Sequence, residues 1–249
     1  MRRRDLILGS AGLAGGLIPG LGRAAEPCPP PLVSVGGGTS ASTACPSASP
    51  GSYVTNFGAT ENPLSEGGMW INGKAVGLSW NNVQSVPGKA FAATFTGNPT
   101  RYSDPIAVLN TTFAANQYAQ GTVFRAPNYS PPDQHEVELL LRFRITANSA
   151  RGYEVLWGIT GGLAIVRWNG PVGNYSELLA TNIGAAVDGD VLRAEIVGGV
   201  VRVYKNGTLV ATGPSNSTWT DGQPGIGFWP LAGTTLGSYG WRSFRAGNL

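Results

Sequence analysis

Histidine and cysteine are almost absent from this sequence of 249 residues. It contains one histidine, His135, and two cysteines, Cys28 and Cys45. A structural zinc site takes about four nitrogen or sulfur ligands, so these three residues are too few to build one. No nucleophile–base pair, metal-ligand cluster or glycine-rich phosphate loop is recognisable either. The enzyme classes that depend on such motifs therefore gain no support from the sequence.

Charge is also scarce, at 12% of residues. The 17 lysines and arginines outnumber the 14 acidic residues, but four of the basic residues and one acidic residue (Arg2, Arg3, Arg4, Arg23 and Asp5) lie before residue 26. Beyond that point 13 basic and 13 acidic residues remain, and the charges balance. Binding to nucleic acid or to an anionic membrane is therefore not indicated.

The first 25 residues have the composition of an export signal. Arginines precede a Gly-, Ala- and Leu-rich stretch, and small residues that a signal peptidase could cut follow at residues 22–25. Arg3-Arg4-x-Leu6-Ile7 resembles a twin-arginine signal, with an ordinary Sec signal as the alternative. The apolar stretch is short and broken by glycine, so it is poorly suited to span a bilayer. We expect a secreted or periplasmic protein without a stable membrane anchor.

Proline, glycine and serine dominate residues 26–56, which predicts a linker without regular secondary structure. Cys28 and Cys45 both lie in this segment. In an exported protein a local disulfide between them is expected, with separate or intermolecular thiols as the alternative. One folded domain is expected over residues 57–249, a length that suits a single β-sandwich.

Short runs rich in Val, Ile, Tyr and Trp fill the last hundred residues, with Gly, Asn and Asp between them. No helical periodicity separates these runs. The pattern predicts an all-β fold, an antiparallel two-sheet jelly-roll sandwich. The expected strands are residues 152–157, 163–168, 191–197, 200–204, 208–212 and 239–245.

Several of these segments resemble a known superfamily. Gly189-Asp-Val-Leu-Arg-Ala-Glu-Ile196, residues 199–210, Gly225-Ile-Gly-Phe228 and Trp241-Arg-Ser-Phe244 are similar to the second half of concanavalin A-like lectin/glucanase domains, in their laminin-G-like bacterial branch. Residues 113–120 resemble the segment that leads into a central strand of such domains. The resemblance covers residues 57–246. It implies the fold but not the function, because the superfamily includes lectins, glycoside hydrolases, polysaccharide lyases and adhesion modules.

Residues 136–145 are the expected strand with the clearest alternation. Apolar side chains should share one face and charged side chains the other. Glu154 and Arg167 should extend the charged face onto neighbouring strands. The resemblance implies that saccharides lie on the open concave sheet, so this face is a candidate polysaccharide groove, with an ordinary solvated sheet face as the alternative. The apolar set is Val137, Leu139, Leu141, Phe143 and Ile145, and the charged set is Glu136, Glu138, Arg142 and Arg144.

Two kinds of catalysis are considered for this face. Retaining glucanases of the superfamily carry Glu-x-Asp-x-x-Glu on one strand, but here Glu138 stands at the Asp position and Leu141 at the second Glu. A polysaccharide lyase would need a base beside groups that neutralise a uronate. The residue types available for a lyase are His135, Tyr153, Tyr204, Arg142 and Arg167. His135, however, has the parity of the core residues unless it precedes the strand.

Three tryptophans sit next to turn signals, where an aromatic ring could stack on a sugar. The predicted substrate-binding residues are Trp168, Trp219, Trp229 and Glu154, and the predicted catalytic residues are Glu138, Arg142 and Arg167. No cofactor is expected. Asp188 and Asp190 offer calcium ligands as an alternative, although they also suit a turn before a strand.

The function predicted from the sequence is that of an exported jelly-roll domain that binds a carbohydrate or glycan surface. A polysaccharide-cleaving enzyme is the first alternative, as a lyase more than as a retaining hydrolase. An adhesion or envelope module without a sugar site is the second.

Overall fold

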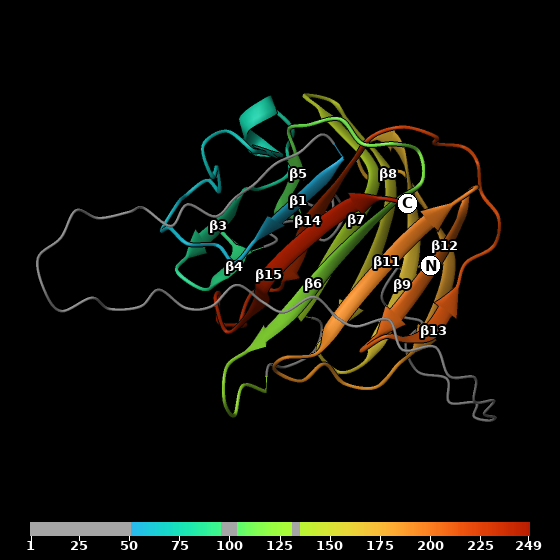
Figure 1. The fold of residues 1–249 in the computed structure, drawn as a ribbon. Helices are drawn as coiled ribbons and strands as arrows, with labels where there is room; N and C mark the ends of the chain where they lie inside the picture. The colour runs from blue at the N-terminus through green and yellow to red at the C-terminus, as the bar shows by residue number, and fades with distance from the viewer. Residues whose placement is uncertain (1–50, 96–103, 131–134) are drawn as a thin grey trace, which may run out of the picture.

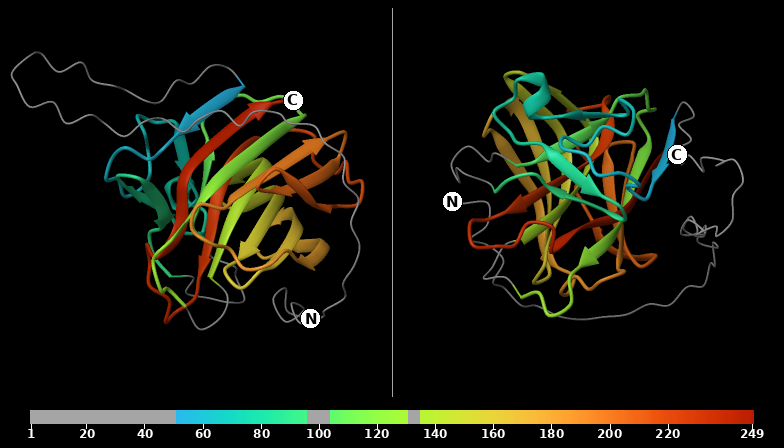
Figure 2. Two further views of the ribbon diagram at one scale, coloured as in Figure 1. Left: turned by 60° about the horizontal axis from the view of Figure 1, so that its bottom comes forward. Right: turned by 90° about the vertical axis from the view of Figure 1, so that its left-hand side faces the viewer.

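The computed structural model describes residues 51–95, 104–130 and 135–249, and strands make up most of them (Figure 1). The strands form two antiparallel sheets that pack face to face (Figure 2). The eight-stranded sheet has the order β13 (Thr208–Thr212), β12 (Val200–Lys205), β11 (Val191–Val197), β6 (Gln117–Arg125), β15 (Tyr239–Asn248), β4 (Lys89–Ala92), β3 (Val83–Val86), with β1 (Ser52–Thr55) paired to β15.

The seven-stranded sheet has the order β10 (Tyr175–Asn182), β9 (Gly162–Pro171), β8 (Ser149–Gly158), β7 (His135–Thr146), β14 (Gln223–Pro230), β5 (Ile106–Leu109), β2 (Trp70–Asn72). The only helix in the described residues is the short 3₁₀ turn η1 (Lys74–Val76). None of the described residues forms a helix long and apolar enough to cross a membrane. The expected fold class is confirmed, and so are the six strands expected in the last hundred residues.

The main hydrophobic core lies between the two sheets. Val137 and Leu139 of β7 point into it together with Val155 and Trp157 of β8. Trp241 of β15 meets them from the other sheet and packs over Gly121, where a Cβ would lie 2.3 Å from the indole. Burial of side chains of this size contributes about 1.5–3 kcal/mol each, which makes this interface the main source of stability.

A second apolar cluster lies on the opposite face of the seven-stranded sheet. Leu140, Leu156 and Val166 belong to it, because alternate residues of a strand point to opposite faces. The connection between η1 and β3 adds Leu78 and Trp80, which are buried in the same cluster. This face of the sheet is therefore covered by the chain itself.

Strand β7 does not alternate regularly over its whole length. Its pairing with β8 shifts between Leu141 and Arg144, and Arg142 has a φ of 47°. Phe143 consequently joins the second cluster, although the alternation predicts it on the same face as Leu141. The predicted parity of β7 is thus wrong from Arg142 onwards, because a β-bulge adds one residue to the strand.

Glycines on both sides make room for this bulge. A Cβ at Gly152 of β8 would lie 2.6 Å from the Cα atom of Phe143, and one at Gly222 would lie 2.4 Å from the carbonyl carbon of Arg142. Both glycines also have positive φ angles. Residues with a side chain would clash at either position, so the glycines permit the irregular pairing.

The sandwich includes residues that the sequence places in the linker. Residues 52–55 form β1, which pairs with residues 244–247 of β15. The predicted signal, most of the predicted linker, and both Cys28 and Cys45 lie outside the described residues.

Candidate functional site

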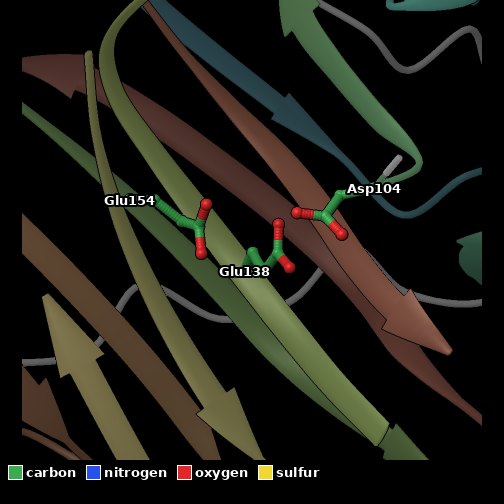
Figure 3. Close-up of side chains that lie close together, drawn as sticks. All are labelled: Asp104, Glu138 and Glu154. Carbon is green, nitrogen blue, oxygen red and sulfur yellow. The ribbon is translucent and has the colours of Figure 1, made fainter. Parts of the chain in front are cut away.

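The carboxylates of the predicted charged face are buried. Glu138 of β7 and Glu154 of β8 have exposed fractions of 0% and 1%. Asp104, which lies just before β5, joins them, and the three offer carboxylate oxygens that all lie within 4.8 Å of one another. Figure 3 shows the three groups converging from different parts of the sheet. Sequence reasoning missed Asp104, because nothing in its local pattern links it to a strand that lies far away in the chain.

Aromatic side chains enclose this carboxylate group. The indole Nε1–H of Trp168 donates to Oε2 of Glu154 at 2.6 Å. The ring of Trp168 meets that of Trp80 edge to face, with 4.5 Å between centroids, and both side chains are fully buried. The predicted groove is therefore neither an open cleft nor a solvated sheet face, and a polysaccharide cannot reach Glu138 or Glu154 in this conformation.

The structure places Arg142 away from these carboxylates. Its guanidinium donates to the carbonyl oxygens of Ala115 at 2.6 Å and Trp219 at 3.0 Å, and its backbone N–H donates to Oε1 of Gln117. Burial lowers the pKa of Arg142 below its usual value. The expectation that Arg142 shares an open face with Glu138 is wrong, because the bulge turns the residue toward these loops.

Arg167 is also separated from Glu138. It pairs with Tyr153 of β8, a main-core residue, and so points to the face opposite Glu154. Its Nε–H donates to Oδ1 of Asn169 at 2.7 Å, and its two terminal nitrogens donate to Thr218 and Ser176 at 3.0 and 3.2 Å. The three predicted catalytic residues are therefore not brought together.

The predicted tryptophans have different environments. Trp168 is fully buried and Trp229 is 4% exposed, so neither ring is open to a ligand in this conformation. Trp219 is half-buried and packs at the edge of the main core. Its Nε1–H donates to the carbonyl of Trp168 at 2.8 Å, and the guanidinium carbon of Arg151 lies 4.7 Å from the centre of its ring. Only Trp219 keeps a partly accessible ring.

The residue types proposed for a lyase are dispersed. His135 is buried at the start of β7, where its Nδ1 lies 2.9 Å from the hydroxyl of Tyr129, and burial lowers its pKa to about 4. The hydroxyl of Tyr153 donates to the carbonyl of Asn216. Tyr204 lies on the eight-stranded sheet, opposite Arg193. These groups do not converge on one site.

The carboxylates considered for calcium are engaged by cations of the protein itself. Arg242 donates to both oxygens of Asp188, at 2.8 and 2.7 Å. Asp190 accepts from Asn206 at 2.8 Å and lies 3.3 Å from the ammonium of Lys205. Groups of the protein therefore already engage both carboxylates of this turn.

Arginines gather where β7, β8 and β9 meet the loop between β13 and β14. Arg144 and Arg151 are cross-strand neighbours, and both contact the carboxylate of Asp221, at 2.5 and 2.8 Å. Arg167 donates to the hydroxyl of Thr218 in this loop. The guanidinium of Arg151 lies over the ring of Trp219 in the same loop. We call this group the arginine cluster; it comprises Arg142, Arg144, Arg151, Arg167, Trp219 and Asp221.

A pocket of about 440 Å³ lies at the opposite end of the sandwich. It is formed by the loop after β6 and the loop before β11, and we call it the loop pocket. Its lining includes Arg125, Asn128, Tyr129, Val187 and Asp188. The side chain of Val187 is 54% exposed, so the pocket offers apolar surface beside a carboxylate. None of these residues except Asp188 was singled out from the sequence.

No family model matches the chain, and no curated protein matches it. Solved structures with the same architecture do match. The metal-free form of the Emp46p carbohydrate recognition domain has a TM-score of 0.54 at 7% identity, over 78% of this chain and 95% of that one. Its potassium-bound form has a TM-score of 0.51 at 8% identity, with the same coverage. A native glycosidic hydrolase has a TM-score of 0.50 at 13% identity, over 81% of this chain and 97% of that one. The resemblance drawn from the sequence is confirmed at the level of the fold.

Proposed function

We propose that this concanavalin A-like jelly roll is a glycan-binding domain and that the loop pocket holds the saccharide. The fold alone assigns no function, since one fold serves many. The observation that carries the proposal is the pocket itself, in which an exposed apolar side chain, Val187, lies next to the carboxylate of Asp188. Concave sites of this kind, with apolar surface and a few convergent polar groups, are the usual form of small-ligand sites.

Asp188 is suited to accept hydrogen bonds from sugar hydroxyls. Partial burial would raise its pKa, but hydrogen bonds from Arg242 and from the backbone N–H of Arg125 outweigh this effect and hold the pKa below its usual value. The carboxylate is therefore ionised at neutral pH and remains 46% exposed. Hydrogen bonds to an ionised acceptor are stronger than those between neutral groups.

Hydrogen bonds hold the described parts of the loop pocket together. The guanidinium of Arg125 donates to the carbonyl of Tyr129 at 2.9 Å and to that of Ala186 at 2.8 Å, which links the two loops. The hydroxyl of Tyr129 accepts the backbone N–H of Thr235 at 3.1 Å. A preformed site loses less conformational entropy on binding than one that must be ordered by its ligand.

Hydrolysis by the buried carboxylates is not part of the proposal. A retaining glycosidase needs two carboxyl groups that both contact the scissile bond. Here Trp80 and Trp168 enclose Glu154, and Glu138 is buried beside it. Binding therefore accounts for the accessible chemistry better than cleavage does.

A matched pair of variants tests the loop pocket. Asp188→Asn and Arg242→Gln both remove the ion pair, but only Asp188→Asn removes the carboxylate from the pocket. The wild-type protein would first be screened against neutral β-glucan, alginate, pectin and glucuronan oligosaccharides, and the best binder titrated by calorimetry. We expect Asp188→Asn to weaken binding about tenfold and Arg242→Gln to change it less than twofold.

Equal losses in both variants, or no binding to any of these saccharides, would contradict the proposal. Incubation with the same polymers, followed by assays for new reducing ends and for unsaturated uronate products, separates a binding domain from an enzyme. Cleavage that persists in Asp188→Asn would point to a catalytic site elsewhere.

Export belongs to the proposal as well. The twin-arginine-like segment and the cysteines lie outside the described residues, and the support for export is the composition of residues 1–25. A domain that binds glycans outside the cytoplasm would be consistent with such a signal.

A further inference from the structure

The arginine cluster carries more positive than negative charge. Arg144 and Arg151 share the single carboxylate of Asp221. Arg142 and Arg167 donate only to neutral oxygens among the described residues. Four guanidinium groups are thus balanced by one carboxylate in contact with them, although the chain beyond residue 25 is neutral overall.

The ion pair between Arg144 and Asp221 is accessible from solvent. The side chain of Arg144 is 51% exposed, and that of Asp221 is 52% exposed. Hydrogen bonds from Arg151 and the charges of Arg151 and Arg144 lower the pKa of Asp221, so the pair remains charged at neutral pH. An exposed ion pair of this kind is weak and can be rearranged by a competing anion.

Arg167 is held in a fixed orientation. Asn169, Thr218 and Ser176 each accept a hydrogen bond from a different nitrogen of its guanidinium. None of these partners neutralises its charge. A guanidinium orientated by neutral groups loses little conformational freedom when an anion binds to it, and its planar shape suits carboxylate and sulfate groups.

The loop that borders the cluster is anchored at several points. The hydroxyl of Tyr153 donates to the carbonyl of Asn216 at 2.8 Å and accepts the backbone N–H of Trp219 at 3.2 Å. The indole of Trp219 donates to the carbonyl of Trp168, and Arg142 donates to the carbonyl of Trp219. Thr218 and Trp219 are therefore held in place beside the arginines.

We infer that the arginine cluster is a second binding site, for anionic saccharides that carry carboxylate or sulfate groups. Arg144, Arg151 and Arg167 would bind the anionic groups, while the hydroxyls of Thr218 and Ser176 and the edge of Trp219 would contact the sugar. That the ligand is a glycan rests on the proposed function. That the ligand is anionic rests on the charge of the cluster alone.

The test uses polygalacturonate and dextran sulfate as the anionic probes and dextran as the neutral probe. Arg167→Gln removes a charge but keeps hydrogen-bonding groups, and Arg193→Gln removes the same charge from the outer face of the eight-stranded sheet, where Arg193 pairs with Glu195. We expect Arg167→Gln to weaken binding of at least one anionic probe about tenfold and Arg193→Gln to leave it within twofold. Binding should also fall steeply with added salt.

A second variant covers the case in which Arg167→Gln does not fold. Arg144→Gln changes a half-exposed side chain and should weaken the same binding about threefold to tenfold. Arg193→Gln is again the control, and Asp188→Asn shows how much of the anionic binding takes place in the loop pocket at the other end. A loss of anionic binding in Asp188→Asn but not in the arginine variants would overturn the second site while leaving the loop pocket intact.

The remaining outcomes also decide the inference. Absence of binding to both anionic probes, or equal binding to dextran, would overturn it whatever the loop pocket does. Single-stranded DNA that binds as tightly as dextran sulfate and depends on Arg167 in the same way would overturn the assignment to saccharides. A response to dextran sulfate alone, or to polygalacturonate alone, supports the site and identifies which anionic group it accepts.

Discussion

Trp168 donates its indole N–H to Glu154 from the neighbouring strand, at 2.6 Å, in a part of the molecule where both side chains are buried. Both residues were predicted to contact a saccharide, and they contact each other instead. The bond satisfies a polar group of the indole and stabilises a carboxyl group beside two others, Asp104 and Glu138. Removing either partner therefore tests what this face of the sheet contributes.

Trp168→Phe should destabilise the protein by about 1–3 kcal/mol, because the buried carboxyl of Glu154 loses a donor. Glu154→Gln should be close to neutral or stabilising, because the amide oxygen can still accept from Trp168 while one of three crowded carboxyl groups is replaced by a neutral amide. Urea denaturation at neutral pH measures both. A larger loss in Glu154→Gln than in Trp168→Phe would show that the carboxyl group of Glu154 stabilises the fold through more than its bond to Trp168.

Arg142→Ala should lower the free energy of unfolding by about 2–4 kcal/mol, since it leaves the carbonyls of Ala115 and Trp219 without this donor. Arg144→Ala is the matched control, because it also removes a β7 arginine but one that is half-exposed. Thermal denaturation of both variants checks the difference. A stable Arg142→Ala variant would mean that the bulge does not depend on the guanidinium.

Gly152→Ala should destabilise the fold by about 3 kcal/mol or more, because its Cβ would meet the backbone of Phe143 at 2.6 Å. Gly189→Ala serves as the control. That glycine has a φ of 86° but no neighbour within 4 Å, so it tests backbone strain alone and should cost about 1 kcal/mol. Equal losses would indicate that strain, and not the close packing of β7 on β8, explains the effect.

His135 should titrate near pH 4, because burial lowers its pKa to about 4 from the ordinary value of 6.5. The unfolded chain then binds this proton more readily than the folded one, so the contribution of His135 to stability is present above about pH 6.5 and is lost as the pH falls toward 4. The loss is at most about 3 kcal/mol. As the only histidine in the chain, it can be followed by NMR without assignment. A midpoint above pH 6 would contradict the buried, neutral imidazole.

Replacement of Arg3 and Arg4 by lysine should retain the precursor in the cytoplasm if export follows the twin-arginine route. Cell fractionation and immunoblotting would reveal it. Export that is unchanged in the double variant, but stops when the Sec route is blocked, would show that the ordinary signal is the correct interpretation.

The strands and the fold class could be predicted from the sequence, because runs of β-branched and aromatic residues between turn residues indicate strands from the local pattern alone. The environment of the charged strand was not. Its alternation is broken at Arg142, and the signals for this break are Gly152 and Gly222, which lie in other parts of the chain. Gly227 gives a similar signal, because a Cβ there would lie 2.3 Å from Oε2 of Glu138.

The candidate sites were predicted only in part. Arg167 and Trp219 do lie in one cluster, but Arg142 supports that cluster from within and Glu138 lies on the other face of the sheet. The covering of that face by Leu78 and Trp80 could not be predicted, because these residues belong to a connection without strand periodicity. The loop pocket could not be predicted either, since it forms only where two loops distant in sequence meet.

The position of β15 determines when this domain can finish folding during synthesis. β15 is the last strand of the sandwich along the chain, yet it pairs with β1, β4 and β6, and Figure 1 shows it within the eight-stranded sheet. Until a ribosome has released this strand, β1 has no partner and β4 and β6 are not joined. The earlier strands of the nascent chain must therefore stay unassociated with other chains until β15 has been made and can join them.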